Sequence, residues 1–273
     1  MDSFCKLFDT KQARQTQKAL DYLDGEQLSY VIRQLNDSKC GRTNWQQKGM
    51  RARYRNITKR VVEKSAQLFN QSPAEVELWS VGADDANDDK TAMFKDILDK
   101  ADFHGFCVNL DQVVRLLKTA LVLVQYDSYA DTFAFDILHR GNAYVMADPV
   151  TRQVYKLIYK LDMEVEEWEY FRVWTPEVIE LWREKENSHE VTLEKVSTEP
   201  NPYGIVPVSV FYDTTLPRTG FWNNVGCDLI DFNDAYNFHL IDMDFAAAWS
   251  VNQTLFTNSR LGGGDEYDGS DRS

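Results

Sequence analysis

The stretch EPNPYGIVPVSVFYDT, residues 199–214, joins a rigid turn to a run of apolar residues. Pro202 fixes its own φ angle and Gly204 tolerates a positive φ, so together they predict a tight turn. The apolar residues that follow predict a strand, and we expect a strand this apolar to be buried on both faces of its sheet. Pro207 has no N–H to donate, so it should lie at the beginning of the strand or on a sheet edge. The predicted structural residues of this turn are Asn201, Pro202, Gly204 and Pro207.

A long helix is predicted directly after this strand, from Cys227 to about Thr257, and it includes the sequence DLIDFNDAYNFHLIDMDFAAAW. Apolar residues recur along it at the spacing of one helix face: Leu229, Phe232, Tyr236, Leu240, Met243 and Ala247. Residues 228–249 contain no Lys or Arg, and their acids are Asp228, Asp231, Asp234, Asp242 and Asp244. Without another element to cover it, the apolar stripe would be exposed to solvent.

Upstream of this pair of elements, helical patterns come first and strand patterns follow from about Leu121, an order that predicts an α+β fold. The helical pattern of residues 11–36 is interrupted at Gly25, and Asn56 is the expected N-cap of a second helix. Its predicted face includes Val61, Val62, Ala66 and Leu68. Short segments rich in β-branched and aromatic residues then predict antiparallel strands, with a hairpin turn at ADPVTRQ, residues 147–153.

These patterns divide the chain into four segments. Residues 1–120 form a helical part, residues 121–226 a β-rich part and residues 227–257 the long helix. Residues 258–273, which end in GGGDEYDGSDRS, are expected to be a flexible tail or the beginning of a truncated further segment.

The charge of the chain is uneven and argues against a protein that chiefly grips DNA phosphates. The net charge is −13, with 14 Lys+Arg against 9 Asp+Glu in residues 1–80 and 16 against 34 in the rest, that is +5 and −18. The stretch RARYRNITKR holds Arg51, Arg53, Arg55, Lys59 and Arg60. These side chains either contact nucleic acid or an acidic neighbouring surface, or are simply solvated.

Signals for catalysis are poor. His104, His139, His189 and His239 match no metal-ligand spacing, and no phosphate-binding or nucleophile motif is present. The acidic segment with Asp84, Asp85, Asp88 and Asp89 lacks the spacing of a calcium loop, so a solvated turn is the better reading. Cys5, Cys40, Cys107 and Cys227 form no CxxC pattern, which indicates free thiols. We expect no enzyme, no cofactor and no metal, and no run of about 18 apolar residues predicts a membrane span.

Several tracts, taken in order, resemble the portal proteins of tailed bacteriophages of the SPP1 Gp6-like type. They are RYRNITKRVVEKSAQLFNQSP, the strand series DTFAFDILHRGNAYVMADPVTRQVYKLIY, YFRVWTPEVIELWRE, NPYGIVPVSVFYDT, and the long-helix sequence that follows. The resemblance covers about residues 15–257. It implies that residues 1–226 form the portal wing and residues 227–257 the first stem helix.

The resemblance also implies a function. Portal subunits form a ring of about twelve copies at the capsid vertex, a closed heterologous assembly. Its central channel passes double-stranded DNA without sequence-specific binding during packaging and ejection. We expect Asp228, Asp231, Asp234, Asp242 and Asp244 to line the channel and repel phosphates, and Arg51, Arg53, Arg55, Arg60 and Tyr236 to lie at the subunit interface. The implied partners are the terminase motor, the major capsid protein and head-completion or adaptor proteins, with no membrane and with assembly in the host cytoplasm.

The match also departs from the family, whose members are longer and continue into a clip, a second stem helix and a crown. Docking of the terminase to this chain alone is therefore doubtful. Two alternatives remain open. The chain is an adaptor with a wing-like fold that forms no channel, or it is an Asp-dependent metal hydrolase that uses the acidic segment with Asp127, Asp131 or Asp136.

Overall fold

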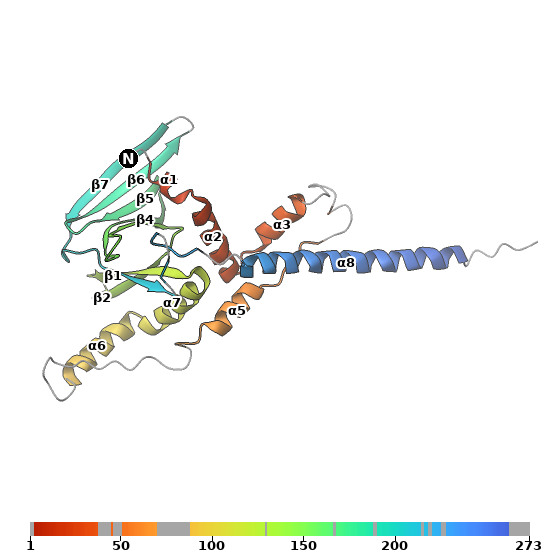
Figure 1. Ribbon diagram of the computed structural model, residues 1–273, viewed down its shortest axis with the longest axis horizontal. Helices are drawn as coiled ribbons and strands as arrows, with labels where there is room; N and C mark the ends of the chain where they lie inside the picture. Colours follow the sequence, from red (N-terminus) through yellow and green to blue (C-terminus); the bar gives the residue numbers. More distant parts are fainter. Residues whose placement is uncertain are drawn as a thin grey trace, which may run out of the picture. The chain divides into compact units, whose positions relative to one another are not determined.

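The protein is described by a computed structural model that covers residues 3–37, 45, 51–69, 88–128, 130–165, 168–187, 190–213, 216–217, 220–224 and 228–261. Helices precede antiparallel strands and a long helix follows them, so the predicted α+β class is confirmed (Figure 1). Contacts group the chain into two compact units. Unit 1 is Met1–Asp24 with Thr58–Cys227, and unit 2 is Gly25–Ile57 with Asp228–Ser273.

The helices of unit 1 are α1 (Cys5–Phe8), α2 (Lys11–Asp24), α6 (Asp88–Lys100) and α7 (Phe103–Leu117), together with α5 (Ile57–Ser65), whose first residue belongs to unit 2. The predicted interruption at Gly25 is confirmed, because Gly25 follows α2 with φ +100°. Helix α5 begins directly after Asn56, but its predicted face is wrong in part. Val62 and Ala66 are buried, whereas Val61 and Leu68 are exposed. Val61 lies about 100° around the helix from Val62, and Leu68 lies beyond the end of α5 at Ser65.

One sheet of unit 1 has the strand order β2-β1-β8, from β1 (Thr119–Asp127), β2 (Thr132–Leu138) and β8 (Val208–Tyr212). The prediction that β8 is buried on both faces is wrong. Strand β8 lies at the sheet edge, its side chains alternate between half-buried and exposed, and Phe211 is 40% exposed. Pro207 directly precedes β8, and its carbonyl accepts the N–H of Val124 at 3.0 Å.

The turn before β8 is held by the side chain of Asn201. Its amide donates to the carbonyls of Thr175 and Ile205, both at 2.7 Å, and its oxygen accepts the N–H of Tyr203 at 3.0 Å. Gly204 has φ +64°, a conformation that glycine adopts without strain. The turn is therefore fixed by one buried amide as well as by its proline and glycine.

The second sheet has the order β3-β4-β5-β6-β7. Its strands are β3 (Ala143–Ala147), β4 (Val154–Val165), β5 (Trp168–Trp174), β6 (Val178–Asn187) and β7 (Glu190–Pro200). The hairpin predicted at residues 147–153 is confirmed: Asp148 N–H donates to the Gln153 carbonyl at 2.9 Å. Strand β7 was not predicted, because apart from Val191, Leu193 and Val196 its sequence EVTLEKVSTEP consists of charged residues, Ser, Thr and Pro. Buried Leu121, Leu157 and Trp174 belong to one core that joins the two sheets.

The N-terminal arm, residues 3–8, packs on one face of the five-stranded sheet. The Glu184 side chain is 1% exposed on β6 and accepts hydrogen bonds from the Ser3 hydroxyl and from the backbone N–H groups of Phe4 (2.5 Å) and Cys5 (3.2 Å). Phe4 contacts the ring of Phe171 at a centroid distance of 5.4 Å. A buried carboxylate with several donors is satisfied, and the arm is tied to the sheet by charge and by aromatic packing.

We expect Glu184→Ala to lower the free energy of unfolding of unit 1 by about 2–3 kcal/mol, because three arm donors lose their charged acceptor. Denaturant unfolding measures the loss. Glu177→Ala, which removes an exposed carboxylate from the turn before β6, is the matched control and should change stability little. Equal stability of the two variants would show that the arm is not anchored by Glu184.

Candidate assembly site on the long helix

The buried face of α8 (Asp228–Leu261) differs from the apolar stripe seen in its sequence. Ile230, Asn233, Asn237 and Ile241 are buried, at spacings of three and four residues. Asn233 and Asn237 are both 0% exposed. The inward face of this helix is therefore part apolar and part amide, a pattern that hydrophobic periodicity does not detect.

The two asparagines hold residues 51–56, a segment that is neither helix nor strand and that we call the strap. Asn237 Oδ1 accepts the backbone N–H of Arg55 at 2.8 Å, and Asn233 Nδ2 donates to the Arg55 carbonyl at 3.0 Å. Asn233 Oδ1 also accepts the N–H of Ile57 at 2.8 Å. Because the backbone groups of a helix hydrogen-bond to one another, only side chains of α8 can hydrogen-bond to the backbone of the strap in this way.

Gln27 completes this amide cluster from the segment before α3 (Leu28–Asp37). Its Oε1 accepts from Asn233 Nδ2 at 3.1 Å and from Asn237 Nδ2 at 3.3 Å, and Gln27 is itself 0% exposed. Next to the cluster, Val31 and Leu35 of α3 form a small core with Trp45 and Ile241. Unit 2 thus joins three separate stretches of sequence by one amide cluster and one apolar core. In the sequence, the amide cluster is indicated only by the four-residue spacing between Asn233 and Asn237.

The strap presents its arginines to solvent. Arg51, Arg53 and Arg55 are all exposed and alternate along the segment, while Ala52 between them packs against the core. Arg53 Nη1 lies 2.7 Å from Asp244 Oδ2 of α8, in a pair whose side chains are 59% and 52% exposed. Such an exposed pair contributes only about 0–1 kcal/mol to stability. Arg60, the other predicted interface arginine, is exposed on α5 in unit 1.

The apolar stripe predicted on α8 is present and largely uncovered. Phe232 is 58% exposed and Met243 is 68% exposed, while Leu229, Tyr236 and Leu240 are half-buried. The rings of Phe232 and Tyr236 stack on each other at a centroid distance of 6.4 Å. Contiguous exposed apolar side chains on one helix stripe are typical of a surface that another element or chain covers.

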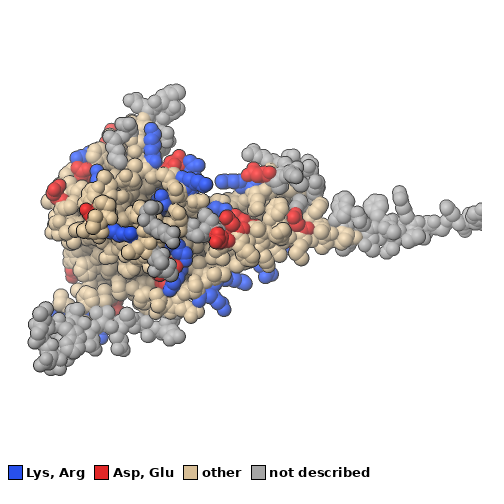
Figure 2. Space-filling model, viewed as in Figure 1, with Lys and Arg blue, Asp and Glu red and all other residues tan. Residues whose placement is uncertain are grey.

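The acids of α8 do not all lie on one stripe. With about 100° of rotation per residue, Asp228, Asp231 and Asp242 fall together, away from both the buried face and the apolar stripe. All three are exposed, and Figure 2 shows acidic side chains over the described beginning of the helix. Asp234 is half-buried, and Asp244 pairs with Arg53. Helix α8 therefore has an inward amide face, an apolar stripe and an acidic stripe.

The candidate residues for hydrolysis are not gathered into a site. Among the residues that the structure describes, no three His, Cys, Asp or Glu side chains are placed to hold a metal ion. Asp131 accepts the Tyr126 hydroxyl, and Asp136 accepts the Gln125 amide at 2.8 Å. Burial lowers the pKa of His139 to about 4, and its Nδ1 accepts the N–H of Gly141 at 3.1 Å. Asp84 and Asp85 lie outside the described residues, as do Cys40, Cys227 and residues 262–273.

The chain combines two antiparallel sheets with a long helix whose apolar stripe is largely exposed, and such stripes are typical of surfaces that another element or chain covers. The family described as phage portal protein, SPP1 Gp6-like, matches residues 2–248. The chain therefore belongs to this family of phage portal proteins, which is structural and not enzymatic, and whose members form an oligomeric ring at the vertex of the phage head. No curated protein matched the chain. None of the described helices is both long enough and apolar enough to cross a membrane.

We expect Asn237→Ala to release the strap, because the Arg55 N–H loses its acceptor at a cost of about 1–3 kcal/mol. Limited trypsin digestion reads this directly, since the strap contains three arginines, and mass spectrometry locates the cuts. Cleavage after Arg53 and Arg55 should be faster than in the unchanged chain. His239→Ala, an exposed change on the same helix, is the control. Cleavage at equal rates in both variants would contradict the role of Asn237.

Proposed function

We propose that the chain is the subunit of a closed portal ring of about twelve copies, with α8 as the channel wall through which DNA is packaged and ejected. The observation that supports this most is the division of α8 into three stripes. A helix in a ring wall must face its own subunit, a neighbouring subunit and the lumen. The amide face, the apolar stripe and the acidic stripe meet these three needs.

The apolar stripe is proposed as the contact with the neighbouring subunit. Phe232, Tyr236 and Met243 lie on it, and their burial in a neighbour would contribute to association in proportion to the area removed from water. The strap arginines are proposed as the polar part of the same interface. Arg51 and Arg55 are exposed and face an acidic body in the next copy, whereas Arg53 already pairs within its own chain. Arg60 is proposed to act in the same way.

The acidic stripe is proposed to face the lumen. Carboxylates repel phosphates over a Debye length of about 8–10 Å, so DNA would slide past them without binding. Asp228, Asp231 and Asp242 are the proposed lining residues, Asp234 lies beside their stripe, and Asp244 lies on the opposite side of the helix, where it pairs with Arg53. Because the repulsion acts on the phosphate backbone alone, the passage of DNA would not depend on its sequence.

The remaining partners follow from the place of a portal in the phage head. We propose that the ring sits in the capsid vertex, contacts the major capsid protein and head-completion or adaptor proteins, and receives DNA from the terminase motor after assembly in the host cytoplasm.

Phe232→Lys should prevent ring formation, because a charge then replaces an apolar side chain in the proposed subunit contact. Phe232 is 58% exposed within the chain, so the protomer itself should keep its fold. Light scattering and electron microscopy of the purified particle measure the assembly, and circular dichroism measures the fold.

The control is Val150→Lys, which adds the same charge at a residue of unit 1 that is 87% exposed. It should leave the ring intact. A ring of normal mass in Phe232→Lys would overturn the proposed interface. A monomer in the unchanged chain that binds other virion proteins would favour the adaptor function.

Replacing Asp228, Asp231 and Asp242 together by Asn should slow ejection or stall packaging, because DNA phosphates would then meet amide donors in place of like charges. The matched control is Asp244→Asn, which removes an acid that lies off the stripe. DNA packaged per particle and the rate of its release are the measurements. Normal packaging and release in the triple variant would contradict the proposal that these acids repel DNA in the channel.

A further inference from the structure

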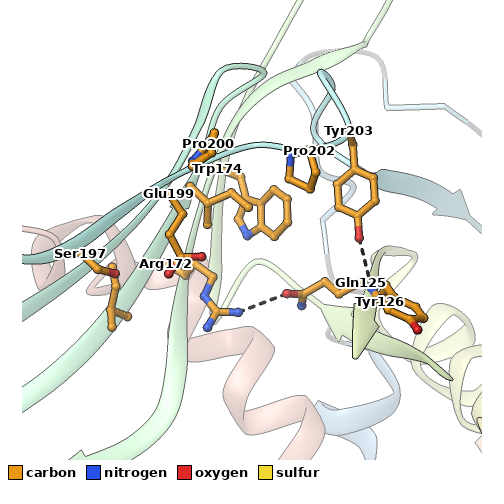
Figure 3. A pocket seen from close by; sticks show the side chains of 11 residues that line it. Gln125, Tyr126, Arg172, Trp174, Ser197, Glu199, Pro200, Pro202 and Tyr203 are labelled. Carbon is orange, nitrogen blue, oxygen red and sulfur yellow. Dashed lines mark hydrogen bonds between the residues drawn. The ribbon is translucent and has the colours of Figure 1, made fainter. Parts of the chain in front are cut away.

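A pocket of about 490 Å³ lies in unit 1, on the face of the five-stranded sheet near its β5–β6–β7 side (Figure 3). Its floor consists of two rows of paired residues on neighbouring strands. One row is Arg172, Leu181 and Ser197, and the other is Trp174, Ile179 and Glu199. Alternate residues of a strand point to the same face, so these six side chains lie on one surface of the sheet.

The wall of the pocket comes from the turn before β8 and from the end of β1. Tyr203 stacks on Trp174 at a centroid distance of 6.3 Å, and its hydroxyl accepts the backbone N–H of Tyr126 at 3.2 Å. Pro200 and Pro202 complete the rim. The turn is rigid because Asn201 fixes it, so the aromatic wall is preformed and does not have to be ordered when something binds.

Arg172 supplies the charge of the pocket. Its Nη1 donates to Gln125 Oε1 at 3.1 Å, which orients the guanidinium across the pocket as Figure 3 shows. Within the described part of the chain, no carboxylate forms a direct ion pair with this guanidinium, and Asp136, which accepts the Gln125 amide, lies within electrostatic range of it. Arg has five N–H donors in a planar fork, so donors are left for a carboxylate of a bound molecule. The carboxylate of Glu199, at the edge of the same floor, disfavours a bound molecule that places a further negative charge beside it.

We propose that this pocket binds an extended segment of a partner protein that places a proline or aliphatic side chain against Tyr203, whose ring stacks on buried Trp174, and a carboxylate on Arg172. The opposite face of the same sheet is covered by the chain's own arm, which is helical from Cys5 to Phe8. There, Phe4 packs on Phe171 and the polar groups of the arm bond to buried Glu184. Among the described strands, β7 pairs only with β6, and its Ser197, Glu199 and Pro200 line the pocket.

The test uses the full chain labelled with 5-fluorotryptophan, and Trp174→Phe assigns the fluorine signal of Trp174. The probes are two peptides, Ac-Gly-Pro-Leu-Asp-Gly-NH2 and the same peptide with Asn in place of Asp. The Asp peptide should move the Trp174 signal and bind about tenfold more tightly than the Asn peptide, with less difference at high salt. Arg172→Met should abolish the preference for Asp.

A second pair of variants separates binding from folding. Ser197→Trp fills the pocket from its floor and should block the Asp peptide, whereas Thr198→Trp adds the same bulk on the other face of β7 and should not. Equal affinity for the two peptides, a Trp174 signal that neither peptide moves, or unchanged binding in Ser197→Trp would each overturn the proposal. All lining residues belong to unit 1, so the result is independent of whether α8 forms a ring.

Discussion

The pairing of buried side-chain amides with the strap backbone is the constraint on which unit 2 depends. An irregular segment packed on a helix has peptide groups that the helix backbone cannot satisfy, because that backbone is already hydrogen-bonded internally. Asn233 and Asn237 supply the missing acceptors and a donor, and Gln27 engages their remaining amide groups. An apolar residue at either position would bury unpaired peptide groups at a cost of about 1–3 kcal/mol each. The inward face of α8 is therefore polar at its centre for a structural reason.

This use of the inward face explains why α8 exposes so much apolar surface. The amides take the positions that would otherwise carry core residues, and Phe232 and Met243 lie on the adjacent stripe, where their own chain leaves them uncovered. Fully burying a side chain of this size contributes about 1.5–3 kcal/mol. One stripe of the helix can thus stabilise the fold of the protomer, while another stripe stabilises the association of protomers. A protomer whose fold does not depend on its neighbours can remain folded until they arrive.

The features that the sequence predicted are those set by local chemistry. Gly25, the hairpin at residues 147–153 and the change from helical to strand periodicity each depend on neighbours in the chain, and the family resemblance depended on the order of such tracts. The inner face of α8 was missed because a hydrophobic pattern counts Asn237 as solvent-facing. The burial of β8 was overestimated because composition does not show that a strand lies at a sheet edge. Strand β7 was missed because its partner β6 stabilises it in spite of a polar sequence. In each case a contact between distant segments decided the outcome.

The five-stranded sheet carries Glu184 on one face and Arg172 on the other, and the two side chains have different surroundings. Glu184 is buried and accepts donors from the N-terminal arm. Arg172 donates to Gln125, with Asp136 within electrostatic range, between the aromatic wall at Tyr203 and the apolar floor at Leu181. A neutral amide holds the guanidinium in place without neutralising it. The charge that this face can still attract is negative, and the rigid wall around it favours a segment that is already extended, since such a segment has little conformational entropy to lose.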